Sequence, residues 1–337
     1  MPAWLEVWLQ FAFCVVVIGF AGVRLIRYGD AIAAWTGLSR SWVGVILVGT
    51  VTSLPELVTG LSAVTVAQSP NMAVGDVLGS CVFNLAILAL VDVVYRRGAV
   101  YAVASGGHIL SAGFGAILLA MAALVMLAST LGFLPSVGHV SWGSLVLLAL
   151  YALAMRTLYL AEQRDRPAAE AQRPAVSLIS LKVALTGYAL AAMVIVGSGI
   201  WLPLIGVELA RIMGWSDSFV GTLFVALATS VPELATTWGA VRIGAIDLAV
   251  GNLLGSNLFD ILILAIDDIA FRPGVLYLRV APIHVLSALC ACVMSGAVVV
   301  ALAYRPVSRV LHLGSWASIA LLGLYLLNAL LQFSHGQ

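Results

Sequence analysis

The chain has 337 residues, of which 62% are hydrophobic and only 9% are charged, and its formal net charge is +1. Soluble globular domains carry about 25% charged residues, so this composition excludes an ordinary soluble protein. The near-zero net charge comes without a basic patch, which gives no indication of a nucleic-acid partner. An integral membrane protein is the class that remains.

The apolar residues form long runs that predict ten membrane-spanning helices. A hydrocarbon core of roughly 30 Å needs about 20 apolar residues per helix, and backbone groups in lipid must be paired within the segment. The expected fold class is therefore an all-α polytopic membrane protein. The first run lacks a cationic start and a cleavage pattern, so it is interpreted as a retained helix and not as a signal peptide. In chain order, the predicted spans are 5–26, 42–67, 73–94, 108–129, 142–160, 178–200, 217–241, 247–267, 280–303 and 312–333.

The basic residues predict which side of the membrane each connection faces. With ten spans the connections alternate, and 13 of the 16 Lys and Arg residues fall in one set. The other set holds only Arg211, Arg272 and Arg279. By the positive-inside rule the first set lies in the cytoplasm, so both termini are expected to face outward.

One polar stretch, 161–176, divides the chain into two halves. It is charged and contains proline, which is typical of a linker, and the alternation of spans places it in the cytoplasm. The residues before it, 1–160, and after it, 177–337, then hold five spans each. The linker is too short for a regulatory domain, so a prokaryotic inner or plasma membrane is the expected location.

The two halves contain matching sequences. Residues 48–64 and 225–241 share 9 identities in 17, at an offset of 177. Residues 70–88 and 246–264 share 9 in 19, at an offset of 176. Because each half has an odd number of spans, the second copy enters the membrane from the opposite side. This predicts an inverted-topology repeat, a design in which secondary transporters place their sites near the midplane.

Two glutamates, Glu56 and Glu233, lie in mid-span at equivalent positions of the repeat. An acid at the bilayer centre costs several kcal/mol, so each indicates a functional site. Pro55 and Pro232 precede them and should break the helices, which would free carbonyl oxygens just before the break. Left empty, two ionised glutamates would repel each other at high cost, which suggests a site that crosses the membrane only when loaded.

Oxygen-bearing side chains accompany the two glutamates. They are the hydroxyls of Thr52, Ser53, Thr229 and Ser230 and, in the following span of each half, the pairs Ser80 with Asn84 and Ser256 with Asp260. Each pair is spaced by four residues and so lies on one helical face. Glycines in these spans should let the helix approach the broken one closely, at Gly75, Gly79, Gly251 and Gly255. Calcium favours 6–8 oxygen ligands, whereas soft metals favour thiolate or imidazole, so the set predicts a hard-cation site.

These motifs resemble the sodium/calcium exchanger branch of the calcium/cation antiporter superfamily, in its prokaryotic form without a regulatory domain. The resemblance lies mainly in 44–88 and 221–264, where Thr-Ser-x-Pro-Glu and Gly-Ser-x-x-Phe strings occur in both halves. It implies a secondary antiporter that exchanges Na⁺ for Ca²⁺ by alternating access. It implies no cofactor, no obligate protein partner and a surrounding lipid bilayer. The first and sixth helices would slide against the rest of the bundle.

The resemblance also implies roles for individual residues. Glu56 and Glu233 would be carboxylates shared by calcium and sodium, and Asn84 and Asp260 would lie centrally between them. The remaining ligands would be the backbone carbonyls of Thr52 and Thr229 for calcium, and Ser53, Ser80, Ser230 and Ser256 with the Ala226 carbonyl for sodium.

Two departures from the family pattern bear on the coupling ion. Asp76 stands where the second half has Asn252, and Cys81 stands where it has Asn257. Asp76 adds an acid that could bind a proton or a cation one turn before Ser80. The alternative function is therefore an H⁺-coupled Ca²⁺ or cation antiporter, with Asp76 and Asp260 carrying the protons.

Functions of other classes are less well supported. An intramembrane hydrolase could use Ser198 or the Asp267–Asp268 pair. Ser198 has no evident histidine base, and adjacent aspartates point in different helical directions, so an enzyme is not expected. A non-transporting scaffold would have no reason to keep two acid-bearing broken helices.

Overall fold

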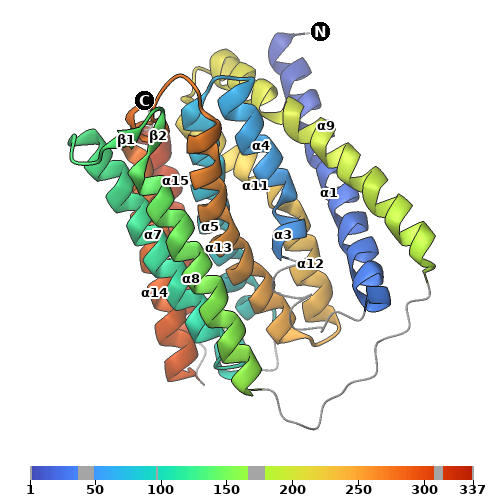
Figure 1. The fold of residues 1–337 in the computed structure, drawn as a ribbon. Coiled ribbons are helices and arrows are strands. Elements are labelled where there is room, and N and C mark those ends of the chain that lie inside the picture. The colour runs from blue at the N-terminus through green and yellow to red at the C-terminus, as the bar shows by residue number, and fades with distance from the viewer. Residues whose placement is uncertain (1, 37–48, 96–97, 166–178, 307–313, 336–337) are drawn as a thin grey trace.

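The computed structural model describes residues 2–36, 49–95, 98–165, 179–306 and 314–335. It is an all-helical bundle with one short hairpin (Figure 1). The first half comprises α1 (Ala3–Thr36), α3 (Gly49–Thr52), α4 (Leu54–Thr65), α5 (Pro70–Val94), α6 (Val100–Val103), α7 (His108–Thr130), the antiparallel strands β1 (Ser136–Val137) and β2 (Val140–Ser141), and α8 (Trp142–Asp165).

The second half repeats this order with more local irregularity. It comprises α9 (Leu181–Met213), α10 (Asp217–Phe219), the π-helix η2 (Val220–Val225), α11 (Ala226–Thr229), α12 (Val231–Arg242), α13 (Ile246–Ala270), the 3₁₀-helix η3 (Leu276–Leu278), α14 (Ile283–Tyr304) and α15 (Trp316–His335).

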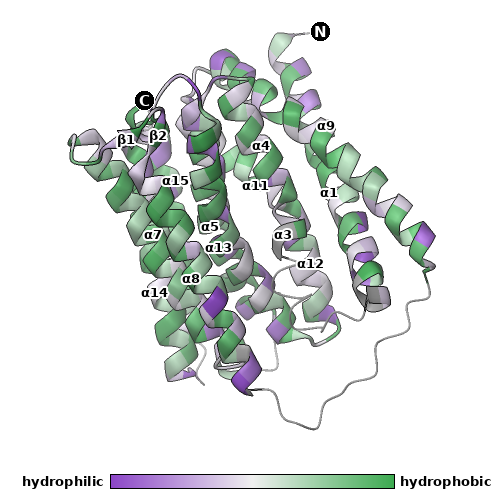
Figure 2. Ribbon diagram, in the orientation of Figure 1, coloured by the Kyte–Doolittle hydropathy of each residue, from purple (hydrophilic) through white to green (hydrophobic). Residues whose placement is uncertain are grey.

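The predicted spans correspond to helices, but two of them, 42–67 and 217–241, are each divided into shorter helical segments. Within the described residues, eight helices are long and apolar enough to cross a membrane, and a ninth crossing is a helix pair that bends by 45° at its break. The predicted span 42–67 corresponds to α3 and α4, while 42–48 lie outside the described residues. The linker prediction also falls mostly outside them, since only 161–165 are described, as the end of α8. Most of each long helix is coloured as hydrophobic, and the hydrophilic residues gather near the helix ends (Figure 2).

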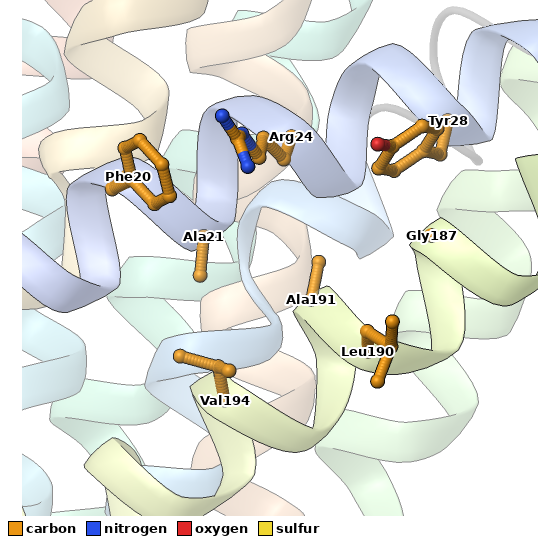
Figure 3. Close-up of a pocket in the computed structure, with 8 residues that line it drawn as sticks. All are labelled: Phe20, Ala21, Arg24, Tyr28, Gly187, Leu190, Ala191 and Val194. Carbon is orange, nitrogen blue, oxygen red and sulfur yellow. The ribbon is translucent and has the colours of Figure 1, made fainter.

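Helices α1 and α9 are longer than predicted. They have 34 and 33 residues, and at 1.5 Å per residue each is about 50 Å long, which exceeds the hydrocarbon core. Windows of about 20 apolar residues identify the spans but miss the extensions. The two helices pack against each other at one side of the bundle (Figure 1). A groove of about 180 Å³ between them is lined by residues such as Arg24 and Tyr28 (Figure 3).

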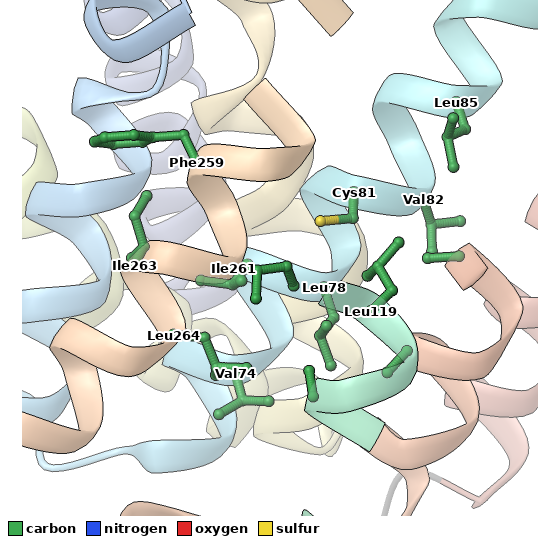
Figure 4. Close-up of a cluster of buried hydrophobic side chains, with 14 of the residues drawn as sticks. Val74, Leu78, Cys81, Val82, Leu85, Leu119, Phe259, Ile261, Ile263 and Leu264 are labelled. Atoms are coloured by element: carbon green, nitrogen blue, oxygen red, sulfur yellow. The ribbon is translucent and has the colours of Figure 1, made fainter. Parts of the chain in front are cut away.

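The centre of the bundle is formed by α5 and α13, which are buried over most of their length. Their side chains meet those of α7 in a continuous apolar core that includes Leu78, Leu119 and Ile261 (Figure 4). A helix surrounded by others is apolar on all its faces, which explains why both sequences are apolar almost throughout. The polar residues that interrupt them are therefore the ones that need an explanation.

Asp92 holds the end of α5. Its carboxylate accepts hydrogen bonds from Val100 N at 2.7 Å, Ser315 N at 2.7 Å and Ser318 Oγ at 2.6 Å. A buried carboxylate is stabilised when it accepts several hydrogen bonds. The sequence analysis did not single out this acid, although its position in the repeat could have revealed it.

Asp268 is the equivalent acid of α13, 176 positions after Asp92. It accepts from Leu276 N at 2.9 Å, Ser141 N at 2.8 Å and Ser144 Oγ at 2.6 Å. The same three kinds of donor serve both aspartates, which supports the predicted relation between the halves. Asp268 therefore acts as a hydrogen-bond acceptor that holds the end of α13.

Candidate functional site

Each half contains a helix interrupted at a serine. Ser53 separates α3 from α4 with φ −86° and ψ 14°, and Ser230 separates α11 from α12 with φ −83° and ψ 8°. These angles fall in the sparsely populated bridge region, where active-site residues are often found. Proline follows two residues later in both, and because it has no N–H, the helix cannot continue its hydrogen bonds unchanged. The predicted breaks are confirmed.

The carbonyl of Ala226 is not freed by the helix break, which corrects the sequence analysis. The break was expected to free it, but it accepts a hydrogen bond from Ser230 N at 3.0 Å, and Thr229 Oγ1 lies 3.2 Å from it. Its role as a sodium ligand stays a prediction. Proline affects the carbonyl four residues before it, which is that of Ala228 and not Ala226. The π-helix Val220–Val225 directly before this segment was also not predicted. Insertions of this kind are frequent at functional sites.

The two glutamates are buried and face hydroxyl groups of the opposite half. Ser230 Oγ donates to Glu56 Oε1 at 3.4 Å, and Ser53 Oγ donates to Glu233 Oε1 at 3.4 Å. Both carboxylates are at most 1% exposed. The broken helices therefore cross so that each interrupting serine lies beside the other half's acid.

Helices α5 and α13, which follow the broken helices in the chain, contribute the predicted serine hydroxyls. Ser80 Oγ of α5 lies 3.1 Å from Ser230 Oγ, and Ser256 Oγ of α13 lies 3.4 Å from Glu233 Oε1. Thr52 Oγ1 and Ser256 Oγ are 3.2 Å apart. These predicted residues are thus brought together around the two glutamates.

Asp76 is joined to the same region by Thr229, whose Oγ1 donates to Asp76 Oδ1 at 2.9 Å. In the other half Thr52 Oγ1 lies 3.5 Å from Oδ1 of Asn252, the residue equivalent to Asp76. The two threonines therefore contact equivalent positions, one an acid and one an amide. This asymmetry adds one negative charge on the Asp76 side when that acid is ionised.

Asn84 and Asp260 lie between the two halves, with Asn257 as a third member. Asn84 Nδ2 donates to Asn257 Oδ1 at 3.0 Å, and Asn257 Nδ2 donates to the Cys81 carbonyl at 3.1 Å. Cys81 Sγ lies 3.6 Å from Asp260 Oδ2. The sequence analysis noted that Asn257 and Cys81 are equivalent, but it did not assign Asn257 to the site.

Five buried oxygens in this region have no hydrogen-bond partner. They are Glu56 Oε2, Glu233 Oε2, Asp76 Oδ2, Asp260 Oδ1 and Asn84 Oδ1. Among the described residues, the ion pairs join His108 to Asp247 and Arg211 to Glu208, so no basic side chain in this part of the chain pairs with these acids. Buried acceptors without donors are costly, and a bound cation or proton would satisfy them.

The donor set fits a hard cation. It consists of carboxylate, hydroxyl, amide and carbonyl oxygens, which is the chemistry of calcium and not of soft metals. No three acidic, histidine or cysteine side chains of the described chain converge in metal-binding geometry. A cation held here would therefore need hydroxyl, amide and backbone oxygens in addition to the glutamates.

The glycine prediction holds for Gly75 and Gly79 in the first half, and it is wrong for Gly251 in the second. A Cβ on Gly79 would lie 2.7 Å from Ala226 Cβ, and one on Gly75 would lie 3.0 Å from Thr222 N, so α5 does approach the second broken helix closely. Gly251 instead faces His108, at 3.3 Å from its ring. The sequence spacing is the same in both halves, but the helix packed against it differs.

The residues proposed for hydrolytic chemistry do not form a site. Ser198 Oγ is exposed and donates to the Val194 carbonyl at 2.9 Å, within its own helix. Asp267 and Asp268 point in different directions, as expected, and only Asp268 accepts hydrogen bonds.

Comparison with known proteins agrees with this arrangement. A family model described as sodium/calcium exchanger protein matches residues 6–160 and 183–334, which is most of both halves. The chain belongs to the sodium/calcium exchanger protein family. Two relatives cover most of its length. Inner membrane protein YrbG of Escherichia coli is 25% identical over 77% of this chain and 78% of its own, and membrane protein MJ0091 of Methanocaldococcus jannaschii is 24% identical over 91% and 94%.

Solved structures share the exchanger fold. The H⁺/Ca²⁺ exchanger CAX matches with a TM-score of 0.73 and 18% identity, over 96% of this chain and 81% of that one. The sodium-calcium exchanger NCX_Mj matches with a TM-score of 0.62 and 20% identity, over 96% of this chain and 97% of that one. At these identities the likeness establishes the fold of this integral membrane protein.

Proposed function

We propose that this exchanger transports Ca²⁺ in exchange for Na⁺, with Glu56 and Glu233 as the carboxylates that bind both ions in turn. The observation that carries the proposal is that both acids are buried at the crossing of two broken helices with one oxygen each unpartnered. Two ionised glutamates neutralise one Ca²⁺ or two Na⁺. Sequence relatives that include a sodium/calcium exchanger of Methanosarcina acetivorans support the same ions.

The surrounding oxygens would complete the coordination of each ion. For calcium, the carbonyls of Thr52 and Thr229 join the two glutamates, because the helix breaks directly after both threonines. For sodium, the hydroxyls Ser53, Ser80, Ser230 and Ser256 flank the centre, and all four are buried. Asn84 and Asp260 would lie between the calcium and the sodium ligands.

Alternating access would come from α1 and α9, which pack against the broken helices. A Cβ on Gly22 of α1 would lie 2.7 Å from Pro232 Cβ, and one on Gly199 of α9 would lie 2.9 Å from Val58 Cγ1. Gly22 and Gly199 are 177 positions apart and therefore equivalent in the repeat. Glycine at both crossings would allow α1 and α9 to slide past the broken helices, at Pro232 in one half and Val58 in the other.

The test is calcium uptake into proteoliposomes. Vesicles loaded with sodium are diluted into sodium-free buffer that contains ⁴⁵Ca²⁺, beside a set loaded with potassium. We expect uptake that requires internal sodium and disappears in Glu56→Gln and Glu233→Gln. Glu208→Gln is the matched control, since Glu208 is partly exposed and pairs with Arg211 on the surface. Uptake that persists in both glutamine variants would refute the assignment of the site.

Proton coupling is the second candidate. The buried acids Asp76 and Asp260 each have an unpartnered oxygen, as a proton carrier would. The fold is also shared with an H⁺/Ca²⁺ exchanger. Uptake that ignores sodium and follows an imposed pH gradient would favour this function, and Asp76→Asn would then be expected to remove the coupling.

The orientation rests on the distribution of basic residues. We propose that both termini face outward from a prokaryotic plasma membrane, because the predicted spans assign 13 of 16 Lys and Arg residues to the opposite side. The N-terminal end of α1 and the C-terminal end of α15 lie at the same end of the bundle (Figure 1). A protease-cleavable tag on either terminus should be cut on intact cells.

A further inference from the structure

Asp267 is a buried acid that the proposed transport site does not use. It lies on α13, its side chain is 0% exposed, and neither carboxylate oxygen has a hydrogen-bond partner. Its equivalent in the first half, 176 positions earlier, is Val91. The acid is therefore an addition to one half only, and the symmetry of the repeat does not explain it.

The packing of α4 makes room for this carboxylate. A Cβ on Gly60 would lie 2.5 Å from Asp267 Oδ2 and 2.9 Å from Oδ1, so only glycine leaves space for the acid in this position. The residue equivalent to Gly60 is Thr237, which accepts a hydrogen bond from Asn252 at 3.2 Å. The second half thus has a hydroxyl with a polar partner at the position where the first half has a glycine packed against Asp267.

The position of Asp267 connects it to the transport centre. Glu56 and Gly60 are four residues apart on α4 and so lie on one helical face, which places Asp267 one turn from the glutamate. On α5, Asp76 lies within electrostatic influence of both Glu56 and Asp267. Glu56, Asp76 and Asp267 therefore form one group of buried acids beside α4.

The other groups around Asp267 do not neutralise it. On η3, Tyr277 lies within its electrostatic influence, and burial with the nearby charge of Asp268 raises the pKa of this phenol, so it stays neutral. Helices α3 and α7 and strand β2 face it with no ionisable group, since the only one they hold, His108, starts α7 at the other end. The arginines of α8 and α12 lie several turns away along their helices.

We propose that Asp267 is a proton-binding site on the access path between Glu56 and the end of the bundle where α4 meets α5. A proton satisfies a single carboxylate, whereas a metal ion would need further ligands, and no third acid, histidine or cysteine of the described chain converges there. This inference rests on the proposed function, because it makes cation binding at Glu56 depend on pH. Ionised Asp267 adds a negative charge near the centre and strengthens cation binding, and protonation removes that charge.

The test compares calcium uptake across a pH series for the wild type, Asp267→Asn and Gly60→Ala. We expect the apparent calcium affinity of the wild type to rise severalfold with pH, and Asp267→Asn to keep the low-pH affinity throughout. Gly60→Ala keeps Asp267 but crowds its carboxylate, so the pH at which the calcium affinity changes should shift. Asp247→Asn is the matched control, because Asp247 lies on the same helix but is exposed and paired with His108.

A measurement without transport separates this inference from the proposed function. Infrared difference spectra between high and low pH should contain a carboxylic-acid band that Asp267→Asn lacks and Gly60→Ala moves. The band tests the site even if uptake proves not to be driven by sodium. An Asp267→Asn protein with the wild-type pH profile and the wild-type band would overturn the proposal. If Asp267→Asn does not fold, an unchanged profile and band in Gly60→Ala would do the same.

Discussion

The contact between Gly79 of α5 and the second broken helix gives a sharp prediction about both stability and transport. In Gly79→Ala the new Cβ would lie 2.7 Å from Ala226 Cβ and 2.8 Å from the Thr222 carbonyl carbon, and it would overlap the Thr222 oxygen. Ordinary contact begins near 3.4 Å, so the two helices must separate by at least about 0.7 Å. The atoms in the way are mostly backbone, which cannot turn aside as a flexible side chain can.

The cost can be worked out from these contacts. Overpacking a well-packed interface destabilises by typically 1–3 kcal/mol, while alanine in a helix gains roughly 0.5–1 kcal/mol over glycine. The expected net loss is about 1–2 kcal/mol, or roughly 5- to 30-fold in the unfolding equilibrium. The next residue, Ser80, contacts Ser230 beside Glu56, so a displaced α5 should also slow transport.

Thermal unfolding in detergent and ⁴⁵Ca²⁺ uptake in proteoliposomes measure the two effects. Gly113→Ala on α7 is the control, because no atom lies within 4 Å of the position its Cβ would take. We expect Gly79→Ala to melt below the wild type and Gly113→Ala to melt at or slightly above it. If both variants melted alike and transported normally, the close approach of α5 to the broken helix would be refuted.

Three further predictions concern other contacts. Gly22→Ala should slow turnover more than it weakens calcium binding, because its Cβ would obstruct the movement of α1 at Pro232. Gly197→Ala is the control and should keep the wild-type turnover, since open space surrounds that position. Equal turnover numbers in the two variants would contradict the sliding motion. Asp268→Asn should lower the melting temperature and reduce the free energy of unfolding by roughly 1–3 kcal/mol, because one of the two accepting carboxylate oxygens becomes an NH2 group that cannot accept. Ser80→Ala should raise the sodium concentration needed for half-maximal exchange, and an unchanged sodium dependence would remove this residue from the sodium sites.

Much of the molecule follows from local properties of the sequence. Apolar runs of about 20 residues predict helices because lipid offers the backbone no other partner. Proline in a helix interior removes a backbone hydrogen bond, and Pro55 and Pro232 located the interruptions before any contact was known. Pro203 lies inside α9 without ending that helix, so proline alone does not decide where a helix breaks. The two glutamates were found by the cost of an acid in mid-span and by their equal places in the repeat.

The tertiary structure decided which groups meet. Ser230 with Glu56 and Ser53 with Glu233 are contacts between residues 174 and 180 positions apart, and no spacing in the sequence specifies them. The same holds for Gly251, which has the sequence context of Gly75 but packs against a histidine.

Asp267 shows the difference most clearly. From the sequence, it and its neighbour Asp268 are two acids at the end of a span. In the folded chain, Asp268 accepts three hydrogen bonds while Asp267 lies unpaired against Gly60 of a distant helix. Helix formation depends on residues within about one turn of each other, so the local composition of the sequence predicts where helices form. The partners of a buried polar group depend on how separate helices pack, and that is fixed only when the whole bundle has formed.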